Sequence, residues 1–174
     1  MCSLLTQESG VRSEVEDSMK DKLTHETIWR IKKYASDEDF KKNRVYEEKI
    51  IKGNILLNDG IGLLWDLGIG VGGTPFDNAH SRIGVGDSTI KEDATQIGLQ
   101  GNHRAYSAMC DVSYPSRNIT SVTWKAIFYG TSANFDWNEF VIDNGTTTLN
   151  RKVSAQGTKT SGQIWTVEVT ITIN

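Results

Sequence analysis

The chain has 174 residues, of which 37% are hydrophobic and 24% are charged, and its formal net charge is −3. This composition is typical of a soluble globular protein with room for one domain. The negative net charge argues against a nucleic-acid partner, since that binding depends on many Lys and Arg side chains that neutralise phosphates. The two cysteines, Cys2 and Cys110, are too few and too far apart for a disulfide framework or a zinc site.

Residues 1–52 are rich in charge and form the first of two predicted regions. About half of all charged side chains lie there, and residues 1–27 are polar with few apolar side chains. Such a segment is typical of a flexible arm that orders on contact with a partner. We therefore expect residues 1–52 to be an extended N-terminal arm that attaches the protein to its partner. Within it, the pattern fits a strand at residues 27–34, a helical turn capped by Ser36 and a strand or short helix at residues 45–51.

The second predicted region, residues 53–174, begins with the one convincing helix of the chain. Residues 54–67 are apolar at most positions, which predicts a helix that is buried on most sides, with Trp65 in the core. Gly60 and Gly62 weaken such a helix by about 1 kcal/mol each relative to Ala. Glycines in a buried helix usually allow another backbone to come close, and we expect that role here.

From Arg82 onward the apolar residues recur with a period of two, which indicates β-strands. A strong turn signal stands at residues 143–145. Several short strands with a turn every 8–12 residues predict a mainly β domain, an antiparallel β-sandwich of jelly-roll-like type with one buried helix. The expected strands span residues 82–86, 104–112, 121–129, 138–142, 147–154 and 164–173.

The closing strand, residues 164–173, has the most regular alternation in the chain. One face is apolar, with Trp165 at its start, and the opposite face is made of threonines and a single charged residue, Glu168. A strand at the edge of a sheet would normally carry more charge to block unwanted pairing. We therefore expect this strand to be central in its sheet or covered by a neighbouring subunit.

No sequence pattern predicts a catalytic site, a metal site or a cofactor. Residues 68–73 match GxGxxG by letter, but a dinucleotide site needs a strand before that loop, and here a helix precedes it. The histidines His25, His80 and His103 have no His or Cys at ligand spacing. We expect a protein that is not an enzyme and that binds neither metal nor cofactor.

One enzymatic alternative rests on the acidic residues around Trp137. Asp136 and Glu139 flank this aromatic side chain and resemble the paired carboxylates of a glycosidase, or the rim of a glycan-binding platform. Acidic residues between strands are more often solvated or part of a turn, so we rank this alternative below a structural role.

Apolar side chains in the predicted arm are candidates for contact with another protein. A Trp among Lys and Arg residues is explained if it packs on the domain or on another subunit, and the sequence leaves both possibilities open. Trp124 and Trp165, which lie on predicted strands, are instead expected in the core. The candidate interface residues are Trp29, Ile31, Tyr34, Phe40 and Tyr46.

Several runs within residues 53–174 resemble a group of tailed-bacteriophage structural proteins. The resemblance implies a virion component, in the head or in the tail, and covers nearly the whole second region. The runs that carry it are Gly53-Asn-Ile-Leu-Leu-Asn-Asp-Gly-Ile61, Gly73-Thr-Pro-Phe-Asp-Asn-Ala79, Arg82-Ile-Gly-Val-Gly-Asp-Ser88, Thr95-Gln-Ile-Gly-Leu-Gln100, Ala133-Asn-Phe-Asp-Trp-Asn-Glu139, Leu149-Asn-Arg-Lys-Val153 and Gly157-Thr-Lys-Thr-Ser-Gly162.

Three functions follow as hypotheses. The first is a capsid decoration (cement) protein that binds the major capsid protein on the outer shell as a homo-oligomer, expected to be a trimer. The second is a tail, neck, baseplate or fibre-attachment protein, and the third is a carbohydrate-binding module. Because the start of the chain lacks a signal-peptide pattern and no stretch approaches the roughly 18–20 apolar residues of a membrane span, we expect synthesis in the host cytoplasm and no membrane partner.

Overall fold

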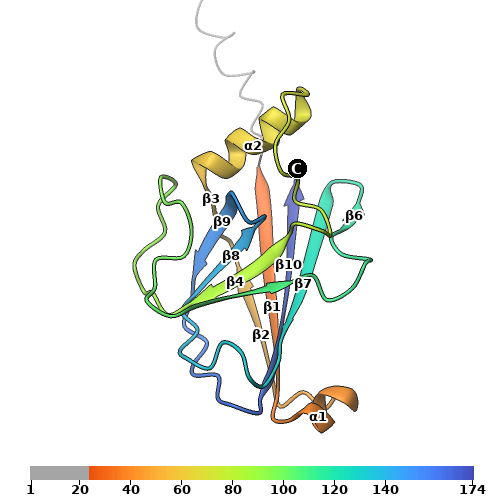
Figure 1. Cartoon of the computed structure of the whole chain (residues 1–174), viewed down its shortest axis with the longest axis vertical. Helices are drawn as coiled ribbons and strands as arrows, with labels where there is room; N and C mark the ends of the chain where they lie inside the picture. Colours follow the sequence, from red (N-terminus) through yellow and green to blue (C-terminus); the bar gives the residue numbers. More distant parts are fainter. Residues whose placement is uncertain (1–23) are drawn as a thin grey trace, which may run out of the picture.

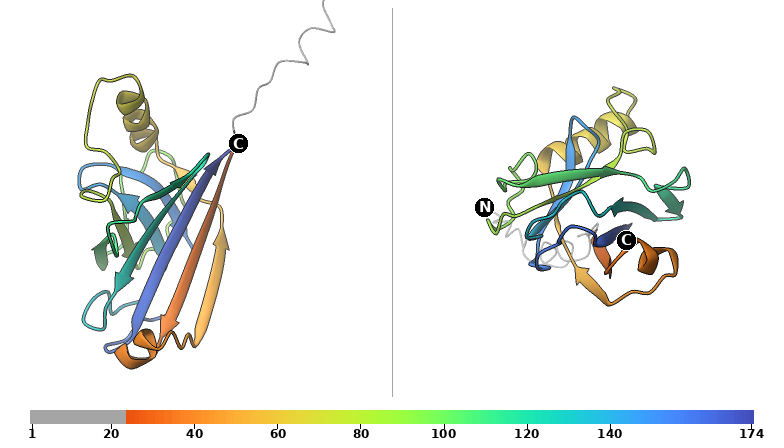
Figure 2. Two further views of the ribbon diagram at one scale, coloured as in Figure 1. Left: turned by 90° about the vertical axis from the view of Figure 1, so that its right-hand side faces the viewer. Right: turned by 60° about the horizontal axis from the view of Figure 1, so that its bottom comes forward.

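The chain folds into two antiparallel β-sheets of five strands each, which face one another as two layers (Figures 1 and 2). The computed structural model describes residues 24–174. Buried side chains from both sheets meet between the layers and form one hydrophobic core. The predicted mainly β, antiparallel sandwich is therefore confirmed.

The first sheet contains both ends of the described chain, and the second is built from its middle. In spatial order, the first sheet consists of β2 (Glu47–Lys52), β1 (His25–Tyr34), β10 (Ile164–Ile173), β7 (Ser121–Phe128) and β6 (Ser116–Asn118). The second consists of β3 (Ile55–Leu56), β9 (Thr148–Val153), β8 (Glu139–Asp143), β4 (Arg82–Gly86) and β5 (Arg104–Ala108). Two helices complete the fold, α1 (Asp37–Lys41) and α2 (Asn58–Gly68).

The closing strand β10 is the central strand of the first sheet. It pairs with β1 on one side and with β7 on the other. Its outer threonines pair across the strands, since Thr170 and Thr123 have their hydroxyl oxygens 2.8 Å apart. Because its backbone groups are satisfied on both sides, β10 needs no charged side chains to block stray pairing. The expectation that this strand is central is confirmed.

The predicted boundary between an arm at residues 1–52 and a domain at residues 53–174 is wrong for residues 25–52. β1 pairs with β10 along all ten of its residues, and β2 pairs with β1. The high charge of this region hides a period of two, in which Trp29 and Ile31 point inward while Arg30 and its neighbours face outward. The part of the predicted arm that precedes residue 24 lies outside the described residues.

Aromatic side chains fill the centre of the core. The ring of Trp137 stands edge-on to Phe128 and to Trp165, with ring centroids 4.9 Å and 4.8 Å apart. Its indole nitrogen donates a hydrogen bond to the carbonyl oxygen of Ala133 (2.9 Å), so the polar atom of this buried ring is satisfied. Trp124 is buried as well, which confirms the prediction that Trp124 and Trp165 belong to the core.

A buried ion pair ties the long loop between β4 and β5 to the second sheet. Glu139 and Arg151 are both fully buried, and a guanidinium nitrogen of Arg151 lies 2.7 Å from the Glu139 carboxylate. The same carboxylate accepts hydrogen bonds from the backbone N–H groups of Gln100 and Gly101. Arg151 also donates to the carbonyl oxygen of Ile90 (2.9 Å). Both ends of the loop therefore depend on one pair of charges.

We expect the substitution Arg151→Met to lower the free energy of unfolding by about 3–5 kcal/mol, because it leaves the Glu139 carboxylate buried without its counter-charge. The double variant Glu139→Gln/Arg151→Met should recover part of this loss. Urea unfolding followed by circular dichroism measures both. Arg30→Met, at an exposed pair with Glu48, is the control and should cost at most about 1 kcal/mol; an equal loss in Arg30→Met and Arg151→Met would contradict the role of burial.

Lys159 is a second buried charge, and its partners are neutral. Its side chain is 1% exposed and donates to the carbonyl oxygens of Tyr129 (2.8 Å) and Ser132 (2.9 Å) and to the side-chain oxygen of Asn134 (2.9 Å). Burial lowers the pKa of Lys159 from 10.5 to about 8. Between these two values the unfolded chain binds more protons at this position than the folded protein, so the contribution of Lys159 to stability rises with pH.

The substitution Lys159→Met should remove this pH dependence. From pH 7 to pH 10, the free energy of unfolding of the natural protein should rise relative to that of the variant by roughly 2–3 kcal/mol. Urea unfolding of both proteins at the two pH values gives this difference, in which the titration of all other groups cancels. Parallel pH profiles of the two proteins would show that Lys159 keeps its ordinary pKa in the fold.

Candidate functional site

Helix α2 is fixed to the sandwich at its first turn. The residue that precedes it, Leu57, is fully buried, and its backbone N–H donates to the carbonyl oxygen of Leu149 on β9 (3.0 Å). A Cβ atom on Gly60 would lie 2.6 Å from the backbone of the same Leu149. The expected close approach of another backbone to this helix is therefore confirmed at Gly60.

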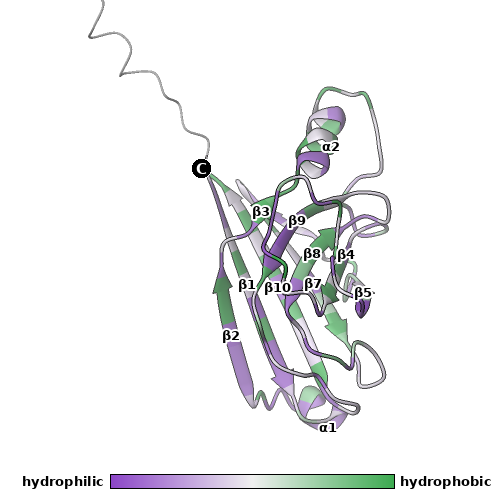
Figure 3. Cartoon of the chain, turned by 90° about the vertical axis from the view of Figure 1, so that its left-hand side faces the viewer, coloured by the Kyte–Doolittle hydropathy of each residue, from purple (hydrophilic) through white to green (hydrophobic). Residues whose placement is uncertain are grey.

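Beyond this turn α2 is exposed, which corrects the prediction of a buried helix at residues 54–67. Gly60 is its one buried residue, and the side chain of Trp65, expected in the core, is 67% exposed. The helix stands at one end of the sandwich, beside the C-terminus, rather than between the sheets (Figures 1 and 3). We call its exposed apolar residues and those of the loop that follows the α2 flange: Ile61, Leu64, Trp65, Ile69 and Val71.

An apolar groove runs between α2 and the end of the first sheet. It consists of two hollows of about 270 Å³ and about 390 Å³. Leu56, Leu64 and Ile173 line both of them, so the hollows adjoin. We call this feature the α2 groove, and its walls include Leu56, Ile61, Leu64, Trp65, Leu67 and Ile173. An exposed apolar surface of this kind is typical of a contact site for another protein segment.

The five residues predicted to form an interface are divided by the structure. Trp29 and Ile31 are fully buried and Tyr34 is 4% exposed, which corrects the prediction for these three: they pack within the protein's own fold. Phe40 on α1 is partly exposed and stands edge-on to Tyr34, with ring centroids 5.1 Å apart. Tyr46 is half-exposed. Only Phe40 and Tyr46 therefore remain available to a partner, and the larger apolar surface lies on α2.

A separate hollow, of about 590 Å³, lies on the outer face of the first sheet beside α1. Its cations and carboxylates largely pair with each other. Arg30 lies 2.5 Å from Glu48 and 3.8 Å from Glu168, and Lys125 lies 3.6 Å from the same Glu168. Because these charges neutralise one another at the surface, the hollow is a weaker candidate for a partner site than the α2 groove.

The residues of the glycosidase alternative are not brought together at the surface. Trp137 and Glu139 are fully buried, the first in the aromatic core and the second against Arg151. Asp136 is exposed and accepts a hydrogen bond from the hydroxyl of Thr158. A buried ring cannot stack on a sugar, and a fully buried carboxylate cannot reach one. The prediction of a carbohydrate site at these residues is therefore wrong.

The histidines occupy separate surface positions. His80 lies 2.7 Å from Asp77, and His103 lies 2.6 Å from Asp87. In each pair the hydrogen bond from the imidazole holds the pKa of the aspartate below its ordinary value. Residues 24–174 contain no group of three or more His, Cys, Asp or Glu side chains that could hold a metal ion. Neither of the two described helices is long and apolar enough to span a membrane.

Comparison of the chain with protein-family models, with curated protein sequences and with solved structures gives no match. The function of the protein is therefore inferred from its own surface. The α2 groove and the α2 flange are the features that distinguish it from a sandwich that is covered by polar side chains.

Two of the glycines of α2, Gly60 and Gly62, allow a matched test of how the helix is attached to the sandwich. Gly60→Ala should destabilise the protein, because the new methyl group meets the backbone of Leu149. In Gly62→Ala the methyl group meets no atom of residues 24–174 within 4 Å, and the variant should gain up to about 1 kcal/mol from helix propensity. Thermal unfolding of both variants checks this, and equal effects would contradict the contact at Gly60.

Proposed function

We propose that this chain is a non-enzymatic structural protein of a tailed-phage virion that decorates the outer surface of the capsid. It attaches through the α2 flange to the major capsid protein or to another protein of the shell, and it acts there as a homo-oligomer, which we expect to be a trimer. It is made in the host cytoplasm and functions in the virion, without catalysis and without a cofactor.

The exposed α2 flange is the observation that carries this proposal. Ile69 and Val71 are each about 70% exposed, and Trp65 is exposed to a similar degree. Large apolar side chains that cluster on a rigidly mounted element favour a protein partner, because burial at an interface removes them from water. A decoration protein needs this combination of a stable β core and a protruding contact surface.

The proposal that the assembly is a tailed-phage virion is based on the amino-acid sequence. The runs that resemble tailed-phage structural proteins lie within residues 53–174, and the first of them, residues 53–61, reaches the first turn of α2. Ile61 is the one flange residue inside such a run, so the flange is chosen as the attachment surface for its exposure. A location in the tail, neck or baseplate shares these features and is the alternative proposal.

Copy number separates the two locations. Quantitative mass spectrometry of purified virions should find hundreds of copies per particle if the protein decorates the shell. A few to a few dozen copies would support the tail alternative, and absence of the protein from the particles would contradict both proposals.

The attachment surface has its own test. Trp65→Glu should reduce binding to shells that lack the protein by at least about tenfold, because it puts a charge into an apolar contact. Val112→Glu is the matched control, since Val112 is 90% exposed and lies outside the flange, and it should bind as the natural protein does. Co-sedimentation with shells measures both, and equal binding of the two variants would exclude the flange as the attachment surface.

A further inference from the structure

None of residues 24–174 fills the α2 groove, although the walls of the groove are apolar. Helix α2 contributes Ile61, Leu64 and Trp65 to one wall, and the ends of β3 and β10 contribute Leu56 and Ile173 to the other. The helix is held against the backbone of Leu149 at Gly60. The groove therefore offers a preformed site for an apolar segment about as long as a short helix.

The N-terminal segment of the chain joins the fold at this groove. Thr24 and His25 form part of the wall of its larger hollow. Thr24 is held by two backbone hydrogen bonds with Asn174, at 3.1 Å and 2.9 Å. Residues 1–23 are thus tethered at the mouth of the groove. Such a short tether gives an effective concentration in the millimolar range, far above that of a separate chain.

The sequence of residues 11–23 fits an apolar groove. Val11, Val15, Met19 and Leu23 recur at intervals of four residues. On a helix this spacing would put all four on one arc of about 120°, and thirteen residues would span about 20 Å, close to the roughly 16 Å of the eleven residues of α2. The pattern is typical of a helix that binds a groove through one apolar face.

We propose that residues 11–23 dock as an amphipathic helix into the α2 groove of their own chain, with Val15 and Met19 against Leu64 and Trp65. The docked segment covers the groove in the free protein. This docking concerns the free protein and does not depend on a role in the virion. One consequence does rest on the proposed function: the segment must leave the groove before α2 can contact a shell.

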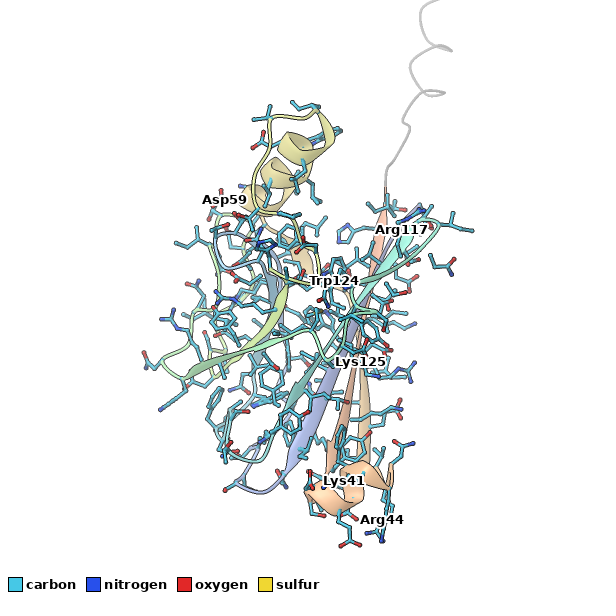
Figure 4. The ribbon with its side chains drawn as sticks, turned by 45° about the vertical axis from the view of Figure 1, so that its right-hand side comes forward. Lys41, Arg44, Asp59, Arg117, Trp124 and Lys125 are labelled. Atoms are coloured by element: carbon cyan, nitrogen blue, oxygen red, sulfur yellow. The ribbon has the colours of Figure 1, made fainter. Side chains whose placement is uncertain are left out.

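A disulfide trap in the full-length chain tests the docking. In a Cys2→Ser/Cys110→Ser background, Met19→Cys is combined with Leu64→Cys, or with Lys41→Cys as the control. Lys41 lies on α1, at the opposite end of the molecule from Asp59 of α2 (Figure 4). A disulfide forms only where the two Cα atoms approach within about 7 Å. Under mild oxidation at low micromolar concentration, the first pair should close within one chain at least about tenfold faster than the control.

Mass spectrometry of the intact protein and its peptides identifies each product. Equal rates for the two pairs would overturn the proposal. So would a bond found only between two chains with a rate that rises with protein concentration, because the segment would then occupy a second copy.

Hydrogen exchange provides a readout that needs no cysteines. In the full chain, Met19→Asp should accelerate exchange of the α2 backbone amides at least about threefold. Ser13→Asp adds the same charge on the opposite side of the expected helix and should leave exchange unchanged. Unchanged exchange in Met19→Asp, or an equal acceleration in both variants, would contradict docking through the apolar face. Because these measurements use the free protein, their failure is distinct from a failure to bind shells.

Discussion

The pairing of β1 with β10 determines how the rest of the molecule is arranged. The two strands run antiparallel over ten residues, from His25 opposite Ile173 to Tyr34 opposite Ile164. This pair joins segments that are about 140 residues apart in sequence. Closing so long a loop costs conformational entropy, and the contacts of the whole sandwich are needed to offset that cost. Once formed, it turns Trp29 and Ile31 into the core and brings the two ends of the described chain together at one end of the molecule (Figure 2).

The position of α2 follows from the same arrangement. The chain leaves the first sheet after β2 and enters the second through β3, whose two residues pair with β9. The next residue, Leu57, fills the end of the core, and Gly60 lets the helix touch the backbone of β9. The later turns of α2 contain no buried residue and stand at one end of the sandwich (Figure 1), beside Ile171 and Ile173 at the end of β10. The helix therefore extends beyond the sandwich, and an apolar groove results.

The sequence predicts those elements whose patterns are local. The strand at residues 164–173 and the strand at residues 82–86 are found with the predicted bounds, and Ser36 caps α1 as expected. What it does not predict is which apolar residues are covered. Trp29 lies in a charged region yet is fully buried, whereas Trp65 lies in an apolar run yet is exposed. Whether each of these side chains is buried depends on strands that are far away in sequence. Neither the local composition nor the spacing of apolar residues indicates which strands those are.

The exposed state of Trp65 is therefore the most informative departure from the sequence pattern. A helix with apolar residues on most sides is normally stable only where other elements cover it. Here the fold supplies cover at Gly60 and leaves the outer turns, with Leu64 and Trp65, facing the groove and solvent. An apolar sequence maintained on a surface that the sandwich cannot bury is explained if another segment completes it. The described chain begins at this groove with Thr24, and the exposed apolar side chains of α2 beside it offer contacts that the sandwich itself does not make.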